Sequence, residues 1–211
     1  MNQDEGWKVA TWAWDKRSQI LGLLAELRDW FRGGKKDAKA EKPGILILGA
    51  GGTGKSTLGR ILSGDFDLLL DPPGEYKESI STEEYELQGE PKAEILVLPG
   101  QSHRRDATWP ELLADLTAGK FRGIILINAY GYHTIGEARY QDTPIFKEKA
   151  KGKGKAGFLA AYIEDRCAEE LAILRRVADA IRPVAGRVWM LSLITKQDLW
   201  WPQRAKVEQH Y

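Results

Sequence analysis

One nine-residue segment, Gly49-Ala50-Gly51-Gly52-Thr53-Gly54-Lys55-Ser56-Thr57, constrains this chain more than any other feature. It matches the pattern GxxxxGK[ST], and it lies between the apolar run 45–48 and a helical pattern that extends to residue 62. Glycines let backbone N–H groups converge on a phosphate, and the N-terminus of the following helix adds positive potential. Lys55 is expected to reach the β- and γ-phosphates, and the Ser56 hydroxyl is expected to ligate Mg²⁺. The segment therefore predicts a nucleoside-triphosphate site. Its expected ligand-binding residues are Gly49, Gly51, Gly52, Thr53, Gly54, Lys55, Ser56 and Thr57.

Apolar runs and helical patterns alternate from residue 44 onward. Strands are predicted at 45–48, 83–87, 94–98, 123–128 and 187–194, and helices at 54–62, 106–118 and 157–181. Glycine and proline in the gap 88–91 indicate a hairpin between the second and third strands. Such alternation predicts an α/β fold whose sheet is mostly parallel and contains one antiparallel pair.

Composition narrows the class of protein. A length of 211 residues suits one domain, with room for an appendage. Lys plus Arg number 31 and Asp plus Glu number 30, so the net charge of +1 excludes a globally basic nucleic-acid binder but not a local basic patch. The single cysteine, Cys167, excludes an internal disulfide framework and a multi-cysteine zinc site. With neither a long apolar run nor a signal-peptide pattern in the sequence, we expect a cytoplasmic protein.

Residues 1–43 differ from the rest of the chain, so we expect an N-terminal unit at 1–43 and a nucleotide-binding domain at 44–211. The N-terminal unit holds four of the eight tryptophans: Trp7, Trp12, Trp14 and Trp30. Apolar residues recur at helical spacing between residues 15 and 31, and the charged stretch 35–43 is typical of a linker. This amphipathic helix could pack on the domain's own flank, bind a partner, or make peripheral contact with a membrane.

A lysine-rich stretch lies between the strand that ends at residue 128 and the long helix that begins at 157. Five lysines alternate there with other residues: Lys147, Lys149, Lys151, Lys153 and Lys155. We expect an irregular, solvated loop. The alternative is a surface for an acidic partner, such as anionic lipid or nucleic acid.

The segment Thr195-Lys196-Gln197-Asp198 follows the last predicted strand and resembles the NKxD base-recognition motif of P-loop GTPases. A carboxylate at its fourth position can accept hydrogen bonds from both N1–H and the exocyclic amine of guanine, whereas adenine offers no such donor pair. The resemblance implies that Asp198 selects guanine and that Lys196 supports the base. Thr195 stands where Asn is usual in the family. An ordinary surface turn is the other interpretation of this segment.

The segment Leu96-Val97-Leu98-Pro99-Gly100-Gln101 resembles the DxxGQ motif of the second switch in small GTPases. The resemblance implies that the N–H of Gly100 senses the γ-phosphate and that Gln101 orients the attacking water. Val97 departs from the pattern, because the family has an Asp there that holds Mg²⁺ through water. That departure leaves metal affinity and the rate of hydrolysis open.

The first switch is expected between the phosphate-loop helix and the hairpin. Ser79, Ser81 and Thr82 could each supply a hydroxyl to Mg²⁺, and Thr82 or Ser81 is the preferred choice. Ordinary turn residues are the alternative. Beyond Gln101, Arg104 or Arg105 could steady transition-state charge, although most surface arginines have no such role.

Together these motifs resemble divergent P-loop GTPases of the small type, which includes the Arf-like and translation-factor classes. The resemblance implies a three-layer fold and a molecular switch that binds GTP or GDP with Mg²⁺, hydrolyses GTP slowly through Lys55 and Gln101, and meets a protein effector or regulator. The alternatives are a non-hydrolysing nucleotide-dependent interaction module and a P-loop ATPase or kinase. Only 13 residues follow Asp198, so the closing strand and helix of the family are expected to be missing. Either the N-terminal helix covers that flank, or the chain is part of a longer one.

Overall fold

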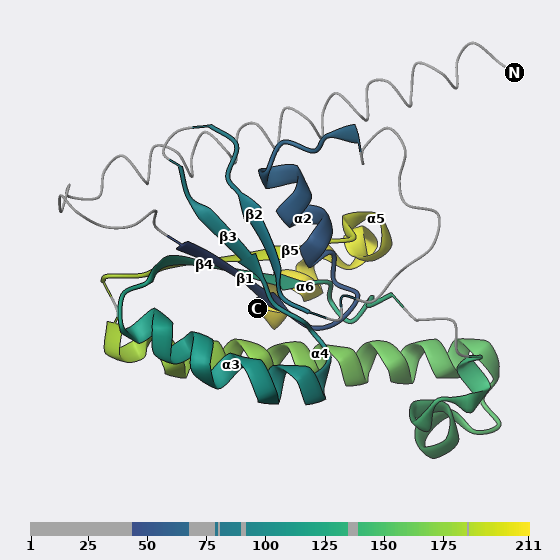
Figure 1. The fold of residues 1–211 in the computed structure, drawn as a ribbon. Helices are drawn as coiled ribbons and strands as arrows, with labels where there is room; N and C mark the ends of the chain where they lie inside the picture. The colour runs from purple at the N-terminus through teal and green to yellow at the C-terminus, as the bar shows by residue number, and fades with distance from the viewer. Residues whose placement is uncertain (1–43, 68–78, 80, 90–91, 135–138, 185) are drawn as a thin grey trace, which may run out of the picture.

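The computed structural model describes residues 44–67, 79, 81–89, 92–134, 139–184 and 186–211 (Figure 1). The expectations for the N-terminal helix and linker at 1–43 lie outside the described residues. So do residues 68–78 and 80 of the connection between the phosphate-loop helix and the hairpin, whereas residues 63–67, 79, 81 and 82 of it are described.

A five-stranded sheet forms the centre of the molecule, with strand order β2-β3-β1-β4-β5. Its strands are β1 (Gly44–Gly49), β2 (Glu83–Glu86), β3 (Glu94–Val97), β4 (Phe121–Asn128) and β5 (Trp189–Ile194). β1 pairs in parallel with β3 and with β4, and β4 pairs in parallel with β5. Among the described strands, β2 and β3 form the single antiparallel pair. The predicted fold class and the predicted hairpin are therefore confirmed.

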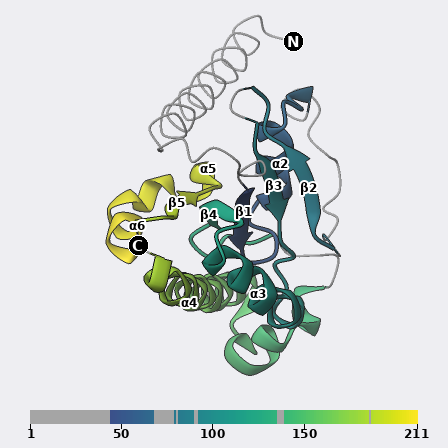
Figure 2. The ribbon, with the colours of Figure 1, turned by 60° about the vertical axis from the view of Figure 1, so that its left-hand side comes forward.

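Helices cover both faces of this sheet, with α2 on one side and α3 and α4 on the other (Figures 1 and 2). The helices are α2 (Lys55–Leu62), α3 (Ser102–Thr117), α4 (Gly154–Ile181), α5 (Gln197–Trp200) and α6 (Arg204–His210). α3 and α4 begin a few residues earlier than predicted, because their first turns are polar or glycine-containing and carry no apolar periodicity. None of the described helices is long and apolar enough to span a bilayer.

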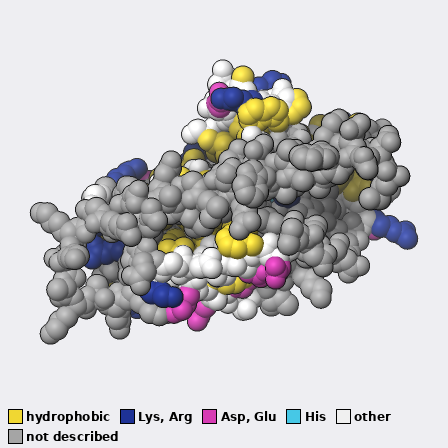
Figure 3. Space-filling model, turned by 90° about the horizontal axis from the view of Figure 1, so that it is seen from above, with side chains coloured by type: hydrophobic (Ala, Val, Ile, Leu, Met, Phe, Trp, Pro, Cys, Tyr) yellow, Lys and Arg dark blue, Asp and Glu magenta, His cyan; other side chains and the backbone are white. Residues whose placement is uncertain are grey.

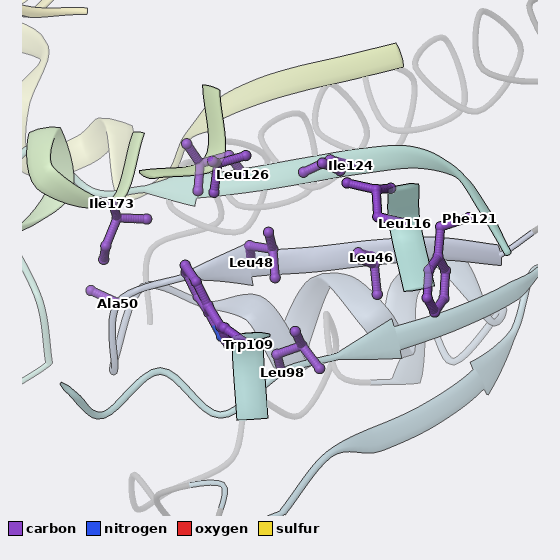
Figure 4. Packing of buried hydrophobic residues seen from close by; sticks show 11 residues of the cluster. Leu46, Leu48, Ala50, Leu98, Trp109, Leu116, Phe121, Ile124, Leu126 and Ile173 are labelled. Atoms are coloured by element: carbon purple, nitrogen blue, oxygen red, sulfur yellow. The ribbon is translucent and has the colours of Figure 1, made fainter. Parts of the chain in front are cut away.

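The two faces of β1 divide the core into two clusters. Ile45 and Ile47 pack with Leu62 of α2, whereas Leu46 and Leu48 pack against α3 and α4. Figure 4 shows this second cluster, in which the fully buried Trp109 of α3 lies beside Leu48 and Leu98. A strand that is buried on both faces reads as a continuous apolar run, which is why residues 45–48 gave a clear prediction.

The chain beyond β5 differs in part from the expectation. In the described residues no strand follows β5, as expected, but a closing helix is present: α5, a short 3-10 turn and then α6. α6 is only seven residues long and buries Val207. The expectation that the chain lacks a helix after its last strand was therefore wrong. The residues after β5 are too few for a long helix, but they form two short ones.

The lysine-rich stretch also needs correction, since it is more regular than expected. It contains a 3-10 turn at Tyr140–Asp142 and a π-helical turn at Phe146–Ala150, and α4 already begins at Gly154. The rings of Tyr140 and Phe146 pack against Phe158 of α4 in tilted contacts, with the Tyr140 and Phe158 centroids 5.1 Å apart. These aromatic contacts, together with the 2.6 Å ion pair between Lys149 and Asp165 of α4, hold the segment on the helix.

Apolar and charged side chains are interspersed on the described part of the face shown in Figure 3. The large apolar residues most exposed in the described ranges are Leu159, Leu199 and Trp201, each close to half exposed.

Candidate nucleotide site

The phosphate loop connects β1 to α2 through backbone conformations that favour glycine. Gly49, Gly52 and Gly54 have φ angles of 146°, 70° and 97°. A Cβ atom on Gly49 would lie 2.3 Å from the carbonyl oxygen of Ile127, so the loop packs tightly against β4. The buried hydroxyl of Thr53 donates to the Ala50 carbonyl across the loop at 3.0 Å. The predicted loop residues thus share one compact turn, except that Thr57 is exposed on α2.

Lys55 is folded onto the loop that it follows. Its Nζ donates to the Ala50 carbonyl oxygen at 2.6 Å. Burial, together with the nearby guanidinium of Arg105, lowers the pKa of Lys55 to about 8. Gly100 lies against the same atoms, because a Cβ there would approach Lys55 Nζ to 2.4 Å and the Gly51 nitrogen to 2.5 Å. The structure therefore brings the predicted sensor glycine to the predicted phosphate-binding lysine.

The Ser56 hydroxyl lies in a cluster of oxygens that the sequence did not fully indicate. Its Oγ is 2.9 Å from Ser79 Oγ and donates to Glu83 Oε1 at 3.0 Å. Ser79 also donates to Glu83 Oε1, and the Tyr85 hydroxyl donates to Oε2 at 2.7 Å. Of the three hydroxyls considered for the first switch, Ser79 is the one beside Ser56. Ser81 is exposed and Thr82 is half-buried just before β2, and the metal role of Thr82 stays a prediction.

Glu83 is the residue that sequence reasoning missed. It starts β2, and its backbone partner in the antiparallel register is Val97, the position where the GTPase motif has Asp. Residues directly opposite each other in an antiparallel pair share one face of the sheet. The sequence does place an acidic residue, Glu83, in the first strand of the predicted hairpin. Its position opposite Val97 becomes apparent only when the register of the two strands is known.

The oxygen cluster suits a hard cation. In the part of the chain that the structure describes, no three His, Cys, Asp or Glu side chains gather to hold a metal. Ser56, Ser79 and Glu83 instead supply hydroxyl and carboxylate oxygens, the ligand type that Mg²⁺ prefers. Mg²⁺ usually binds one or two carboxylates and takes its remaining ligands from phosphates and water, so these residues fit it.

The predicted base motif lies against the phosphate loop. Thr195 Oγ1 donates to the carbonyl oxygen of Thr53 at 2.7 Å, and it also lies 3.0 Å from the Asn128 carbonyl. Lys196 adopts a left-handed conformation, with φ 56°, and its Nζ donates to Thr134 Oγ1 at 2.8 Å. Thr195 and Thr53 are 142 residues apart in sequence. The structure thus joins the two motifs that the sequence could only place on separate strands.

Lys196 and Asp198 occupy different environments at this motif. Burial lowers the pKa of Lys196 to about 8, although the nearby Asp198 opposes the shift. Asp198 itself is exposed in the first turn of α5. An exposed carboxylate can accept hydrogen bonds from an incoming ligand without first losing a protein partner.

The loop after β4 is held by a buried carboxylate, Glu170 of α4. Glu170 accepts hydrogen bonds from the N–H groups of Ala129 and Gly131, at 2.6 and 3.2 Å, and its Oε1 is 2.7 Å from His133 Nε2. The hydroxyl of Tyr211 donates to the other oxygen. This loop continues to Thr134, whose N–H donates to the Gly52 carbonyl at 3.1 Å. Glu170 therefore braces the phosphate loop indirectly.

Gln101 and Arg105 follow the predicted sensor glycine. Gln101 precedes α3, and within the described residues its buried Oε1 accepts no hydrogen bond. Arg105 is buried rather than a surface arginine: it donates to the Gly100 carbonyl at 2.9 Å and pairs with Glu169 of α4 at 2.6 Å. In this arrangement Arg105 fixes the backbone at Gly100 instead of projecting into solvent.

Comparison with known proteins gives little beyond this geometry. No family model and no curated protein matches the chain. Among solved structures it is similar to the mammalian SRP receptor, with 19% identity and a TM-score of 0.28 over 40% of this chain and 41% of that one. It is also similar to the Arl6 BBS3 small GTPase from Trypanosoma brucei with bound GppNp, with 12% identity and a TM-score of 0.34 over 80% of this chain and 99% of that one. The chain thus matches about two fifths of the first structure's length.

Proposed function

We propose that this chain is a guanine-nucleotide-binding switch that hydrolyses GTP slowly with Mg²⁺ and responds to a protein effector or regulator. One observation carries the proposal: the 2.7 Å hydrogen bond from Thr195 to the Thr53 carbonyl. It fixes the TKQD segment at one side of the phosphate loop, so a single bound nucleotide can contact the loop with its phosphates and Asp198 with its base.

One set of residues would bind the phosphates, and another would position the attacking water. Loop N–H groups and Lys55 bind the phosphates, and Lys55 must leave the Ala50 carbonyl to do so. Gly100 offers its N–H beside Lys55, where the γ-phosphate would lie. Gln101 Oε1, which accepts no hydrogen bond from the described residues, can accept one from a water that attacks in line. Mg²⁺, when bound, supplies charge neutralisation on the phosphate oxygens.

Titration calorimetry with GTP, GDP and ATP tests the guanine preference. GTP and GDP should bind at least ~10-fold more tightly than ATP, because a bidentate pair of hydrogen bonds to a carboxylate contributes more than 1.4 kcal/mol. Asp198→Asn should weaken GDP binding and strengthen binding of xanthosine diphosphate, since an amide can donate to the xanthine oxygen. Asp179→Asn, the same change at an exposed position of α4, is the matched control and should bind like the wild type. Equal affinity for ATP and GTP would refute the guanine assignment.

A second function is favoured by a specific observation, the apolar Val97. Its side chain is 1% exposed in the core cluster that includes Ile95 and Leu62, so it brings no carboxylate to the metal side. A nucleotide-dependent interaction module that does not hydrolyse GTP would result if no other group replaces that carboxylate. Single-turnover phosphate release with and without Mg²⁺ separates the two functions.

A further inference from the structure

We propose that Glu83 supplies the Mg²⁺-side carboxylate that the second-switch position lacks, together with the hydroxyls of Ser56 and Ser79. The inference rests on the proposed nucleotide binding and deepens it. The family's carboxylate would come from β3 at position 97, whereas here the neighbouring strand β2 provides it from the residue directly opposite. The carboxylate therefore comes from the strand next to the one that carries it in the family, at the paired position and on the same face of the sheet.

The distances in the cluster support a shared cation. An octahedral Mg²⁺ with oxygens at about 2.1 Å places neighbouring ligand oxygens about 3.0 Å apart. Ser56 Oγ is 2.9 Å from Ser79 Oγ and 3.0 Å from Glu83 Oε1, and Ser79 and Glu83 are also hydrogen-bonded. Two of the three oxygen–oxygen contacts, both made by Ser56, therefore already have the spacing expected on one triangular face of such a shell, and the third pair, Ser79 and Glu83, lies closer together.

The charge of Glu83 is available for that role. Its donors in the cluster are neutral hydroxyls, those of Ser56, Ser79 and Tyr85, and within the described ranges it forms no ion pair. Hydroxyl groups can rotate, so Ser56 and Ser79 can turn their lone pairs toward a cation while Tyr85 keeps its hydrogen bond to Oε2. Lys55 interacts electrostatically with Glu83 but forms no ion pair with it, and its Nζ donates to the Ala50 carbonyl.

Mn²⁺ binding to the GDP complex tests the assignment without any turnover. The probe is free Mn²⁺ measured by electron paramagnetic resonance in the presence of the full chain and GDP. Glu83→Gln should weaken Mn²⁺ binding by about 10- to 100-fold. GDP affinity in EDTA should stay within about 3-fold of the wild type. Glu84→Gln is the matched control, because it removes the same charge at the next, exposed position of β2 and should leave Mn²⁺ affinity unchanged.

Ser79→Ala provides a second variant that keeps the carboxylate, and it should weaken Mn²⁺ binding several-fold. Wild-type Mn²⁺ affinity in both Glu83→Gln and Ser79→Ala would overturn the assignment while leaving nucleotide binding intact. Failure of the wild-type chain to bind GDP at all, with or without the metal, would instead overturn the proposed function on which the assignment rests.

Discussion

Two glutamates lie in different parts of the candidate site, and they differ in how many hydrogen bonds their carboxylates accept. Glu170 holds the loop that contacts Lys196 of the base motif, which we call the base edge, and Glu83 contacts Ser56, at what we call the metal edge. Glu170 at the base edge is fully buried, and it accepts two backbone N–H groups, a histidine and a tyrosine hydroxyl. Glu83, at the metal edge beside Ser56, is half-buried, and among the described residues its hydrogen-bond donors are hydroxyl groups. A saturated buried carboxylate holds a loop in place, whereas a carboxylate without a cation is poised to receive one.

Removing the charge of Glu170 should give the largest loss of stability. Glu170→Gln exchanges a carboxylate that has four donors for an amide whose NH₂ group would face donors such as Tyr211. We expect the free energy of unfolding to fall by about 3 kcal/mol, as when one partner of a buried pair is removed. Urea denaturation followed by tryptophan fluorescence measures it. Glu208→Gln, at an exposed pair on α6, is the control and should change stability by less than about 0.5 kcal/mol. If Glu170→Gln lowered the free energy of unfolding as little as Glu208→Gln does, the proposed difference between Glu170 and Glu83 would be wrong.

The same residue should shape the response to acid. Burial by itself would raise the pKa of Glu170, but His133, Tyr211 and the Ala129 N–H hold that pKa below its ordinary value of 4.5. A carboxyl with a lowered folded pKa stabilises the protein above about pH 4.5, and the contribution is lost as the pH falls through the folded pKa. Thermal unfolding from pH 6 to pH 3 should therefore show a flatter acid limb in Glu170→Gln than in the wild type. Parallel limbs in the two proteins would contradict this assignment of the acid sensitivity.

Loss of the Thr195 hydroxyl should have an intermediate effect at the base edge. Thr195→Val keeps the shape of the side chain but removes the donor to the Thr53 carbonyl, which leaves a partly buried acceptor without its partner. We expect the free energy of unfolding to fall by about 1 to 2 kcal/mol. GDP affinity should drop more than the affinity for inorganic pyrophosphate, because the bond positions the base motif relative to the loop. Thr195→Ser should retain most of both, and equal losses for GDP and pyrophosphate would assign the bond to the loop alone.

The smallest effect is expected at the metal edge when nucleotide and metal are absent. Glu83→Gln keeps an acceptor for the Ser56 and Ser79 hydroxyls and removes a charge that has no paired cation in the described residues. We expect the unfolding free energy to change by less than about 1 kcal/mol, in contrast to Glu170→Gln. A loss as large as that of Glu170→Gln would show that Glu83 is a structural group, and would weaken its assignment to the cation.

Sequence and structure agree most closely where the local pattern decides the conformation. The run at 45–48 had to be a buried strand, and the glycines at 49, 52 and 54 adopt the positive φ angles that the phosphate loop requires. The resemblance to the second-switch motif implied that Gly100 senses the γ-phosphate, and the structure brings Gly100 beside Lys55. The local pattern did not reveal that α3 begins right after Gln101, because its polar first turn carries no periodic signal.

Contacts between segments that are distant in the sequence could not be predicted from local patterns. Arg105 is buried against Glu169, which lies in another helix, so its local surroundings suggested a surface arginine. Glu170, His133 and Tyr211 come from three separate segments, and each residue alone has many ordinary explanations. Ser79 could not be separated from Ser81 and Thr82 by type or spacing, since all three carry hydroxyl groups.

The amino-acid sequence by itself determined the phosphate loop, the strand that leads into it and the α/β order of the chain, because these depend on local periodicity and on backbone conformations that glycine allows. Only the tertiary structure decided which carboxylate meets Ser56 and which threonine holds the base motif. The register of β2 on β3 and the approach of Thr195 to Thr53 are set by packing between segments that lie far apart in the sequence.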